Sequence, residues 1–124
     1  PTLAEVCQLK VPKGVEGISF MPLIKNPKRP WKKAAFSQYP RSTSGNRHRK
    51  QGDFMGYSIR TDRYRYIEWR NVKTRLVQAR ELYDHQADPQ EMKNLAGLPD
   101  QTVKLEELEL LLKGGWQKAL PANH

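Results

Sequence analysis

Residues 34–70 read AAFSQYPRSTSGNRHRKQGDFMGYSIRTDRYRYIEWR, and this stretch decides the fold. Apolar and aromatic residues gather at its two ends, whereas residues 42–52 consist mainly of Ser, Thr, Gly, Asn and basic residues. Runs of the first kind are typical of strands, and the composition of the middle is typical of a loop. We therefore expect a strand at residues 34–39 in the centre of a small sheet, ended by Pro40, and a long basic loop that leads into further strands.

The apolar side chains of residues 55–59 alternate with small or polar ones, which is the period of a half-buried strand. Residues 64–69 alternate in the same way, and Thr61 and Asp62 between the two runs favour a tight turn. The sequence therefore predicts a β-hairpin, followed by a polar connection and a short fourth strand at residues 80–83.

Capping boxes predict two short helices. Thr2 with Glu5, and Asp88 with Glu91, have the spacing at which a side chain at each position satisfies a free backbone N–H of the first turn. The second of these helices should end at Gly97.

A last helix is predicted from Pro99 to the pair Gly114-Gly115. Its apolar stripe consists of Val103, Leu108, Leu111 and Leu112. The predicted fold class is α+β, with a small four-stranded antiparallel sheet and helices on one face.

Cys7 is the only cysteine, so a disulfide within the chain and a cysteine-rich metal site are both excluded. It shares an apolar helical face with Leu3 and Val6, which predicts a buried thiol. No apolar run reaches the length of a membrane span. The chain begins at Pro1 and not at Met, which favours a fragment or a processed chain.

The formal net charge is +9, and its distribution is uneven. Between Gly17 and Gly52 there is no acidic residue, and the basic ones are Lys25, Lys28, Arg29, Lys32, Lys33, Arg41, Arg47, Arg49 and Lys50. Such a field attracts anions and weakens with salt. The candidate partners are nucleic acid, an acidic polysaccharide or a sulfated or phosphorylated small molecule; the alternative is a solvated basic surface.

The string PTLAEVCQLKVPKGVEGISFMPLIKNP resembles the segment that follows the catalytic core in sulfatases. Three further strings resemble the C-terminal subdomain of that family: WKKAAFSQYPR, MGYSIRTDRYRYIEWR and ELYDHQADPQEMKNLA. The strings FSQYPR and MGYSIRT are most similar to iduronate-2-sulfatase and its bacterial relatives, whereas ELYD…DPQE…NLA is shared by sulfatases broadly. The resemblance implies an alkaline-phosphatase-like parent fold. It divides the chain into residues 1–30, a connecting segment from a catalytic core, and residues 31–124, the C-terminal subdomain.

The resemblance also implies chemistry that this chain does not carry. Sulfatases hydrolyse sulfate esters with a formylglycine made within a Cys/Ser-x-Pro-x-Arg motif and with calcium. Here Cys7 is followed by Gln8-Leu9-Lys10, so no catalytic residue and no metal ligand is assigned. Formylglycine and calcium are implied for the missing core, and the chain alone is expected to be inactive. The implied partners are the N-terminal catalytic portion and a sulfated carbohydrate, such as a glycosaminoglycan, in a periplasmic, secreted or lysosomal setting.

The candidate substrate-binding residues are Gln38, Tyr39 and Arg41, which match the family string, together with Arg47 and His48 in the basic loop. Arginine binds carboxylates and sulfates through two parallel hydrogen bonds, and a histidine gains charge in an acidic compartment. The alternatives are a structural ion pair for Arg41 and solvated side chains for the loop residues.

A stand-alone nucleic-acid-binding module is the rival interpretation, because basic charge with strand aromatics suits single-stranded nucleic acid. Its weakness is that the basic residues lie in coil and loop, while the strand aromatics alternate into the expected core. A third interpretation is an assembly role, in which the basic coil docks on an acidic partner chain.

Overall fold

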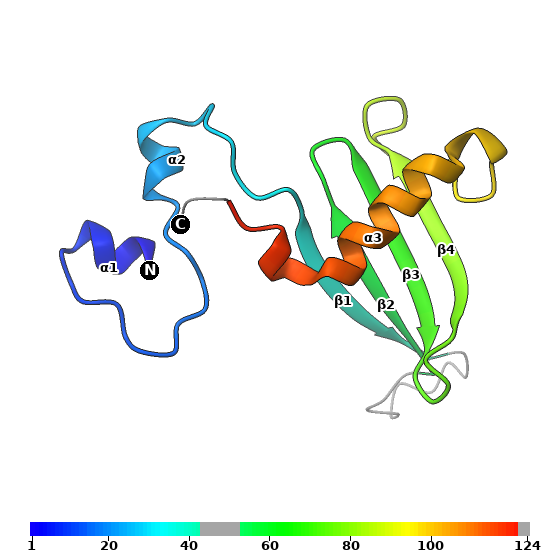
Figure 1. The fold of residues 1–124 in the computed structure, drawn as a ribbon, viewed down its shortest axis with the longest axis horizontal. Coiled ribbons are helices and arrows are strands. Elements are labelled where there is room, and N and C mark those ends of the chain that lie inside the picture. The colour runs from blue at the N-terminus through cyan, green and yellow to red at the C-terminus, as the bar shows by residue number, and fades with distance from the viewer. Residues whose placement is uncertain (43–52, 122–124) are drawn as a thin grey trace. The chain divides into compact units, whose positions relative to one another are not determined.

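A computed structural model describes residues 1–42 and 53–121 (Figure 1). The chain forms two compact units, one made of Pro1–Lys32 with the C-terminal residues from Leu120, the other of Lys33–Ala119. The functional division predicted after residue 30 stays a prediction. The predicted site residues Arg47 and His48 lie outside the described residues.

The first unit contains α1, Thr2–Val6, and α2, Met21–Lys25. Thr2 lies inside α1 and does not cap it, so the predicted capping box is wrong. Its hydroxyl oxygen instead accepts a hydrogen bond of 3.0 Å from the backbone N–H of Phe20. The side chain thus joins two segments of this unit, and the first turn of α1 is left without a side-chain cap.

A further sequence expectation fails in the first unit. Cys7 is exposed and not buried, and it follows the last residue of α1, Val6. Pro22 lies in the first turn of α2. A proline is tolerated there because the first N–H groups of a helix have no intrahelical partner.

The second unit is a four-stranded antiparallel sheet in the order β1-β2-β3-β4, with α3 across one face (Figure 1). The predicted α+β fold class and the hairpin are confirmed. The strands are β1, Ala35–Arg41; β2, Phe54–Arg60; β3, Tyr64–Asn71; and β4, Val77–Asp84, and the helix α3 is Thr102–Lys118.

One row of paired residues runs across the sheet from β1 to β4 and forms the core: Phe36, Ile59, Tyr66 and Leu82. Ile59, Tyr66 and Leu82 are fully buried, and Leu108 of α3 belongs to the same cluster. Because side chains alternate along a strand, this row decides which residues of every strand face α3 and which face away.

The strand β1 lies at the edge of the sheet, so the expectation of a central strand is wrong. It also continues past Pro40, which pairs with Met55. Proline is tolerated on an edge strand, because its missing N–H can point away from the neighbouring strand. Arg41 therefore belongs to the sheet itself and is held by its register opposite Phe54.

The helix predicted after Asp88 is absent; residues 85–98 form turns along the outer edge of β4. Asn94 Oδ1 accepts a hydrogen bond of 3.0 Å from the N–H of Leu82, and the N–H of Leu95 donates to the carbonyl oxygen of Leu82 over 2.8 Å. Glu91 has a φ of +57°, which a right-handed helix excludes. The segment thus satisfies an edge that would otherwise be open to pairing with other chains.

The last helix follows a 3-10 turn, Pro99–Gln101. Gly115 has a φ of +76°, so regular helical geometry breaks at the predicted Gly-Gly pair and one further turn follows. Leu108 is buried as predicted, but Val103 is 79% exposed and lies outside the apolar stripe. None of the helices in the described part of the chain is both long and apolar enough for a membrane crossing.

A half-buried ion pair closes the end of the β3–β4 ladder beside the turn that joins β2 to β3. Arg63 donates from Nε to Asp84 Oδ1 over 2.8 Å and from Nη2 to Oδ2 over 2.6 Å. The side chain of Asp84 is 10% exposed and also accepts from the N–H of Gln86. The hydrogen bonds from Arg63 are the largest cause that lowers the pKa of Asp84, to about 2.

Because folding lowers this pKa, Asp84 stabilises the fold above its unfolded pKa of about 4, and we expect that contribution to disappear as the pH falls towards 2. Asp84→Asn should lower the free energy of unfolding at neutral pH and reduce its slope between those pH values. Urea unfolding followed by tryptophan fluorescence measures both. Asp62→Asn, in the neighbouring exposed turn, is the matched control. An unchanged slope in Asp84→Asn would contradict the assignment.

Candidate functional site

The structure separates the three predicted site residues that it describes. Gln38 is two residues from Phe36 and therefore lies on the face that carries α3. Tyr39 and Arg41 lie on the opposite face, and both are exposed. Only Tyr39 and Arg41 can therefore act together on one ligand at this face of the sheet.

A hollow lies on that opposite face, beside the end of β1, with a volume of about 480 Å³. We call it the Arg41–Trp69 hollow; its lining residues are Arg41, Ser42, Phe54, Trp69, Gln78, Ala79 and Glu81. All four strands contribute to it, because Arg41 pairs with Phe54 and Trp69 pairs with Ala79. The volume lies in the range of small-molecule sites.

The floor of the hollow is the indole of Trp69, which lies over the backbone of Gly56. A methyl group on Gly56 would lie 2.8 Å from Cζ3 and 3.0 Å from Cε3 and Cη2 of Trp69. Three atoms of the six-membered ring are thus close to one backbone position. The absence of a side chain at Gly56 lets the ring lie against β2.

Two hydrogen bonds hold Glu81 in the wall of the hollow. Trp69 Nε1 donates to Oε1 over 2.6 Å, and the hydroxyl of Tyr83 donates to Oε2 over 2.9 Å. Burial, and then the hydrogen bond to Glu81, raise the pKa of Tyr83 to about 12, so its hydroxyl keeps its proton at neutral pH. Each carboxylate oxygen retains a further lone pair for a ligand donor.

Arg41 stands at the other end of the hollow. Its guanidinium carbon lies 5.5 Å from the centre of the Trp69 ring, within the range of a cation–π contact. It makes no ion pair with any residue among 1–42 and 53–121. Within the described residues its N–H donors are therefore available to an anion, and the alternative of a structural ion pair finds no partner there.

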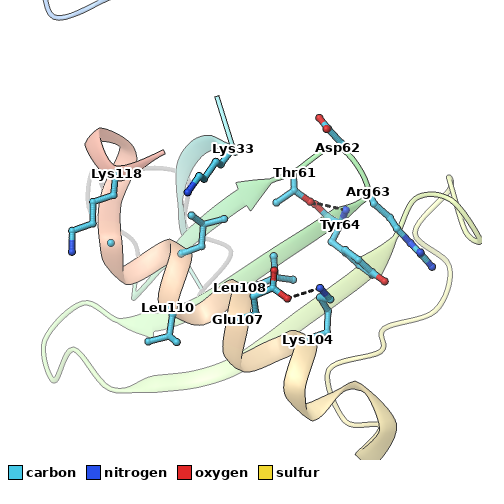
Figure 2. Close-up of a pocket in the computed structure, with 12 residues that line it drawn as sticks. Lys33, Thr61, Asp62, Arg63, Tyr64, Lys104, Glu107, Leu108, Leu110 and Lys118 are labelled. Carbon is cyan, nitrogen blue, oxygen red and sulfur yellow. Dashed lines mark hydrogen bonds and ion pairs between the residues drawn. The ribbon is translucent and has the colours of Figure 1, made fainter. Parts of the chain in front are cut away.

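A second hollow of about 900 Å³ lies between the turn that joins β2 to β3 and the helix α3 (Figure 2). Its floor is apolar and includes Leu108, and its rim is basic. Lys104 is paired with Glu107 over 2.5 Å, and both Lys104 and Arg63 lie over the ring of Tyr64. Arg63 and Lys104 thus already have acidic partners, whereas Lys33 and Lys118 on the same rim have no ion pair within the described residues.

The described residues offer no calcium site. Among 1–42 and 53–121, no three His, Cys, Asp or Glu side chains lie close enough together to hold a metal ion. The resemblance places calcium in the catalytic core outside this chain, and that stays a prediction.

The sequence analysis missed Trp69, Glu81 and Gln78 as site residues. It assigned Trp69 to a strand and placed Gln78 in the connection before the fourth strand, whereas β4 begins at Val77. Gly56 was the available signal, since a glycine inside an alternating strand often marks a close approach. Which side chain approaches it depends on the pairing of Gly56 with Trp69, and that register is tertiary information.

Residues 1–115 match the family described as N-sulphoglucosamine sulphohydrolase, C-terminal. The chain belongs to this family of sulfatase C-terminal domains. The resemblance of its strings to the C-terminal subdomain of sulfatases is thereby confirmed.

Two relatives agree with this assignment. This sulfatase C-terminal domain is 34% identical over 119 residues to the N-acetylglucosamine-6-O-sulfatase of Bacteroides thetaiotaomicron, an alignment that covers 91% of this chain and 19% of that protein. It is similar to the solved structure of BT4656 in complex with its substrate D-glucosamine-2-N,6-O-disulfate, with 29% identity, a TM-score of 0.71, and coverage of 92% of this chain and 22% of that one.

A third likeness supports the fold alone. It is to a sulfatase structure from work on glycosaminoglycan metabolism by Bacteroides thetaiotaomicron, with 24% identity, a TM-score of 0.60, and coverage of 86% of this chain and 23% of that one. The sulfatase C-terminal domain spans about a fifth of the length of its relatives. These relatives do not show the narrower likeness to iduronate-2-sulfatase.

Gly56→Ala should destabilise the domain by about 1–3 kcal/mol, because the added methyl group forces the Trp69 ring off the sheet. Urea unfolding gives the free energy, and the tryptophan emission should shift as the ring moves. Gly97→Ala is the matched control, since a methyl group there meets nothing within 4 Å. Equal stability of the two variants would contradict the close packing of Trp69 on Gly56.

Proposed function

We propose that this chain is the C-terminal part of a longer sulfatase that hydrolyses sulfate esters of a glucosamine-containing glycosaminoglycan. The observation that carries this proposal is the family match over residues 1–115. The glucosamine substrate is suggested by the 34% identical relative described as an N-acetylglucosamine-6-O-sulfatase. The chain supplies a wall of the substrate cleft and positive charge, and residues outside it perform the hydrolysis. Formylglycine and calcium, when present in the preceding core, supply the nucleophile and the polarisation of the sulfate.

The part assigned to this chain is binding and orientation. Arg41 presents a guanidinium without an ion-pair partner among the described residues, beside an aromatic floor, and a guanidinium forms two parallel hydrogen bonds with a carboxylate or with two oxygens of a sulfate. The pairing of β1 with β2 holds the backbone of Arg41 in register opposite Phe54. Tyr39 lies two residues earlier on the same face and is 70% exposed.

An iduronate 2-sulfate ester is the second candidate substrate, favoured by the strings FSQYPR and MGYSIRT. A stand-alone nucleic-acid-binding role has less support. Tyr66 of β3 is fully buried and donates to Glu68 over 2.8 Å, so it cannot stack on a base, whereas Tyr39 is 70% exposed. The family match over residues 1–115 is what favours the sulfatase interpretation. The basic residues of the loop lie outside the described residues and add nothing to either interpretation.

The test is sulfate release by the longer polypeptide that ends in this chain, measured by ion chromatography. We expect hydrolysis of N-acetylglucosamine 6-sulfate, and no turnover by the 124-residue chain alone. Arg41→Ala should raise KM by about tenfold or more, the cost of one charge-assisted hydrogen bond of about 1.5 kcal/mol, whereas Arg41→Lys should recover part of it.

Lys93→Ala is the control, because it removes one exposed positive charge from the segment that borders β4 and should leave KM unchanged. Hydrolysis of an iduronate 2-sulfate ester in preference to the glucosamine ester would select the second substrate. Turnover by the isolated chain, or no sulfate release from either ester, would overturn the function proposed.

A further inference from the structure

The Arg41–Trp69 hollow has two ends of opposite charge. Arg41 at the end of β1 is a cation, and Glu81 on β4 is a carboxylate whose Oε1 accepts from the Trp69 indole. Between them lies the flat aromatic floor. A ligand that fits this arrangement has a flat apolar face and one anionic substituent. Its hydroxyl groups lie on the edge opposite that substituent.

We infer that the hollow is a pyranose-binding subsite, in which a sugar ring with one carboxylate or sulfate stacks on Trp69, its anion held by Arg41 and its hydroxyls by Glu81. Aromatic rings present a large apolar face at a small cost in conformational entropy. The volume of about 480 Å³ falls within the range for small ligands.

The position of the Trp69 ring depends on the absence of a side chain at Gly56. Because Gly56 has no side chain, the Trp69 indole rests on β2. Trp69 lines the hollow, and the Arg41 guanidinium carbon lies over its ring, 5.5 Å from the centre. The hydrogen bond of 2.6 Å to Glu81 fixes the rotation of the ring in its plane. Trp69 is therefore oriented before a ligand arrives, which lowers the cost of binding.

Glu81 gives the subsite its selectivity. Tyr83 and Trp69 hold the carboxylate by both oxygens, so it cannot turn away from the hollow. A second sulfate on the Glu81 side of the ring would meet a like charge, whereas hydroxyl groups would donate to it. The ring in this subsite thus carries its anion on the Arg41 side only.

The choice of ligand, a sulfated polysaccharide, rests on the function proposed above. The test measures binding and not turnover. The sample is the longer polypeptide that ends in this chain, labelled with 15N at its tryptophan indoles and arginine side chains; Trp69→Phe and Trp31→Phe identify the signals of Trp69 and Trp31. The probes are N-acetylglucosamine 6-sulfate, a glucuronate methyl glycoside, unsulfated N-acetylglucosamine and inorganic sulfate.

We expect both anionic sugars to shift the Trp69 signal, with the stronger of the two identifying the anion that the subsite prefers. The signal of Trp31 should not move; it is the internal control, since Arg29 lies over its ring at 5.7 Å in a similar Arg–Trp pair that lines no hollow described here. Trp69→Ala, observed through the Arg41 side-chain signal, should weaken sugar binding about fivefold or more.

Glu81→Gln tests selectivity, because it keeps an acceptor for the indole and removes the charge. It should bind glucosamine 2-N,6-O-disulfate about fivefold more tightly relative to the 6-sulfate, the ratio expected for removing a like charge about 4 Å away in water. An unchanged ratio would overturn the assignment of Glu81.

An adventitious anion site is the competing outcome: inorganic sulfate would then shift the Trp69 signal as far as the sugars do. That result, or no shift with any sugar, overturns the subsite. If the longer polypeptide still releases sulfate, the proposed function stands while the subsite fails. If Trp69 binds the sugars but no sulfate is released, the subsite stands and the sulfatase assignment fails.

Discussion

The packing of α3 on one face of the sheet is the constraint on which the rest depends. Leu108 meets the buried row of Ile59, Tyr66 and Leu82, and this contact keeps the apolar core of the second unit away from water. Because side chains alternate strictly along each strand, covering one face assigns every neighbouring residue to the other. Arg41, Trp69 and Glu81 share a hollow for this reason.

The covered face is not purely apolar, and its polar residues are all satisfied within the described part of the chain. Glu68 is fully buried; it accepts from the Tyr66 hydroxyl over 2.8 Å and from Arg70 Nη2 over 2.5 Å. Arg80 donates to the same hydroxyl and lies 3.6 Å from Glu109, whose side chain is only 19% exposed. A charge buried in this way is stable only with its partners in place, so the network specifies the register between β3, β4 and α3.

The two edges of the sheet are treated differently. Asn94 and Leu95 occupy the outer edge of β4 through hydrogen bonds to Leu82, whereas β1 carries Pro40 and the exposed side chains of Tyr39 and Arg41. Proline and charge both discourage unwanted strand pairing. The edge strand β1, which carries Arg41, is thus protected from unwanted strand pairing by its own residues.

The sequence by itself determined the strands and their number, the β2–β3 hairpin, the break at Gly115 and the membership of a sulfatase family, because these depend on local alternation, turn residues and contiguous strings. Contacts between residues far apart in the chain decided the remaining features, because local patterns carry no information about them. Thr2 and Asn94 left their predicted helical roles because a distant N–H, of Phe20 and of Leu82, offered each a partner. Tertiary structure likewise placed β1 at the edge and brought Trp69 onto Gly56, since strand order and register join residues far apart in the chain.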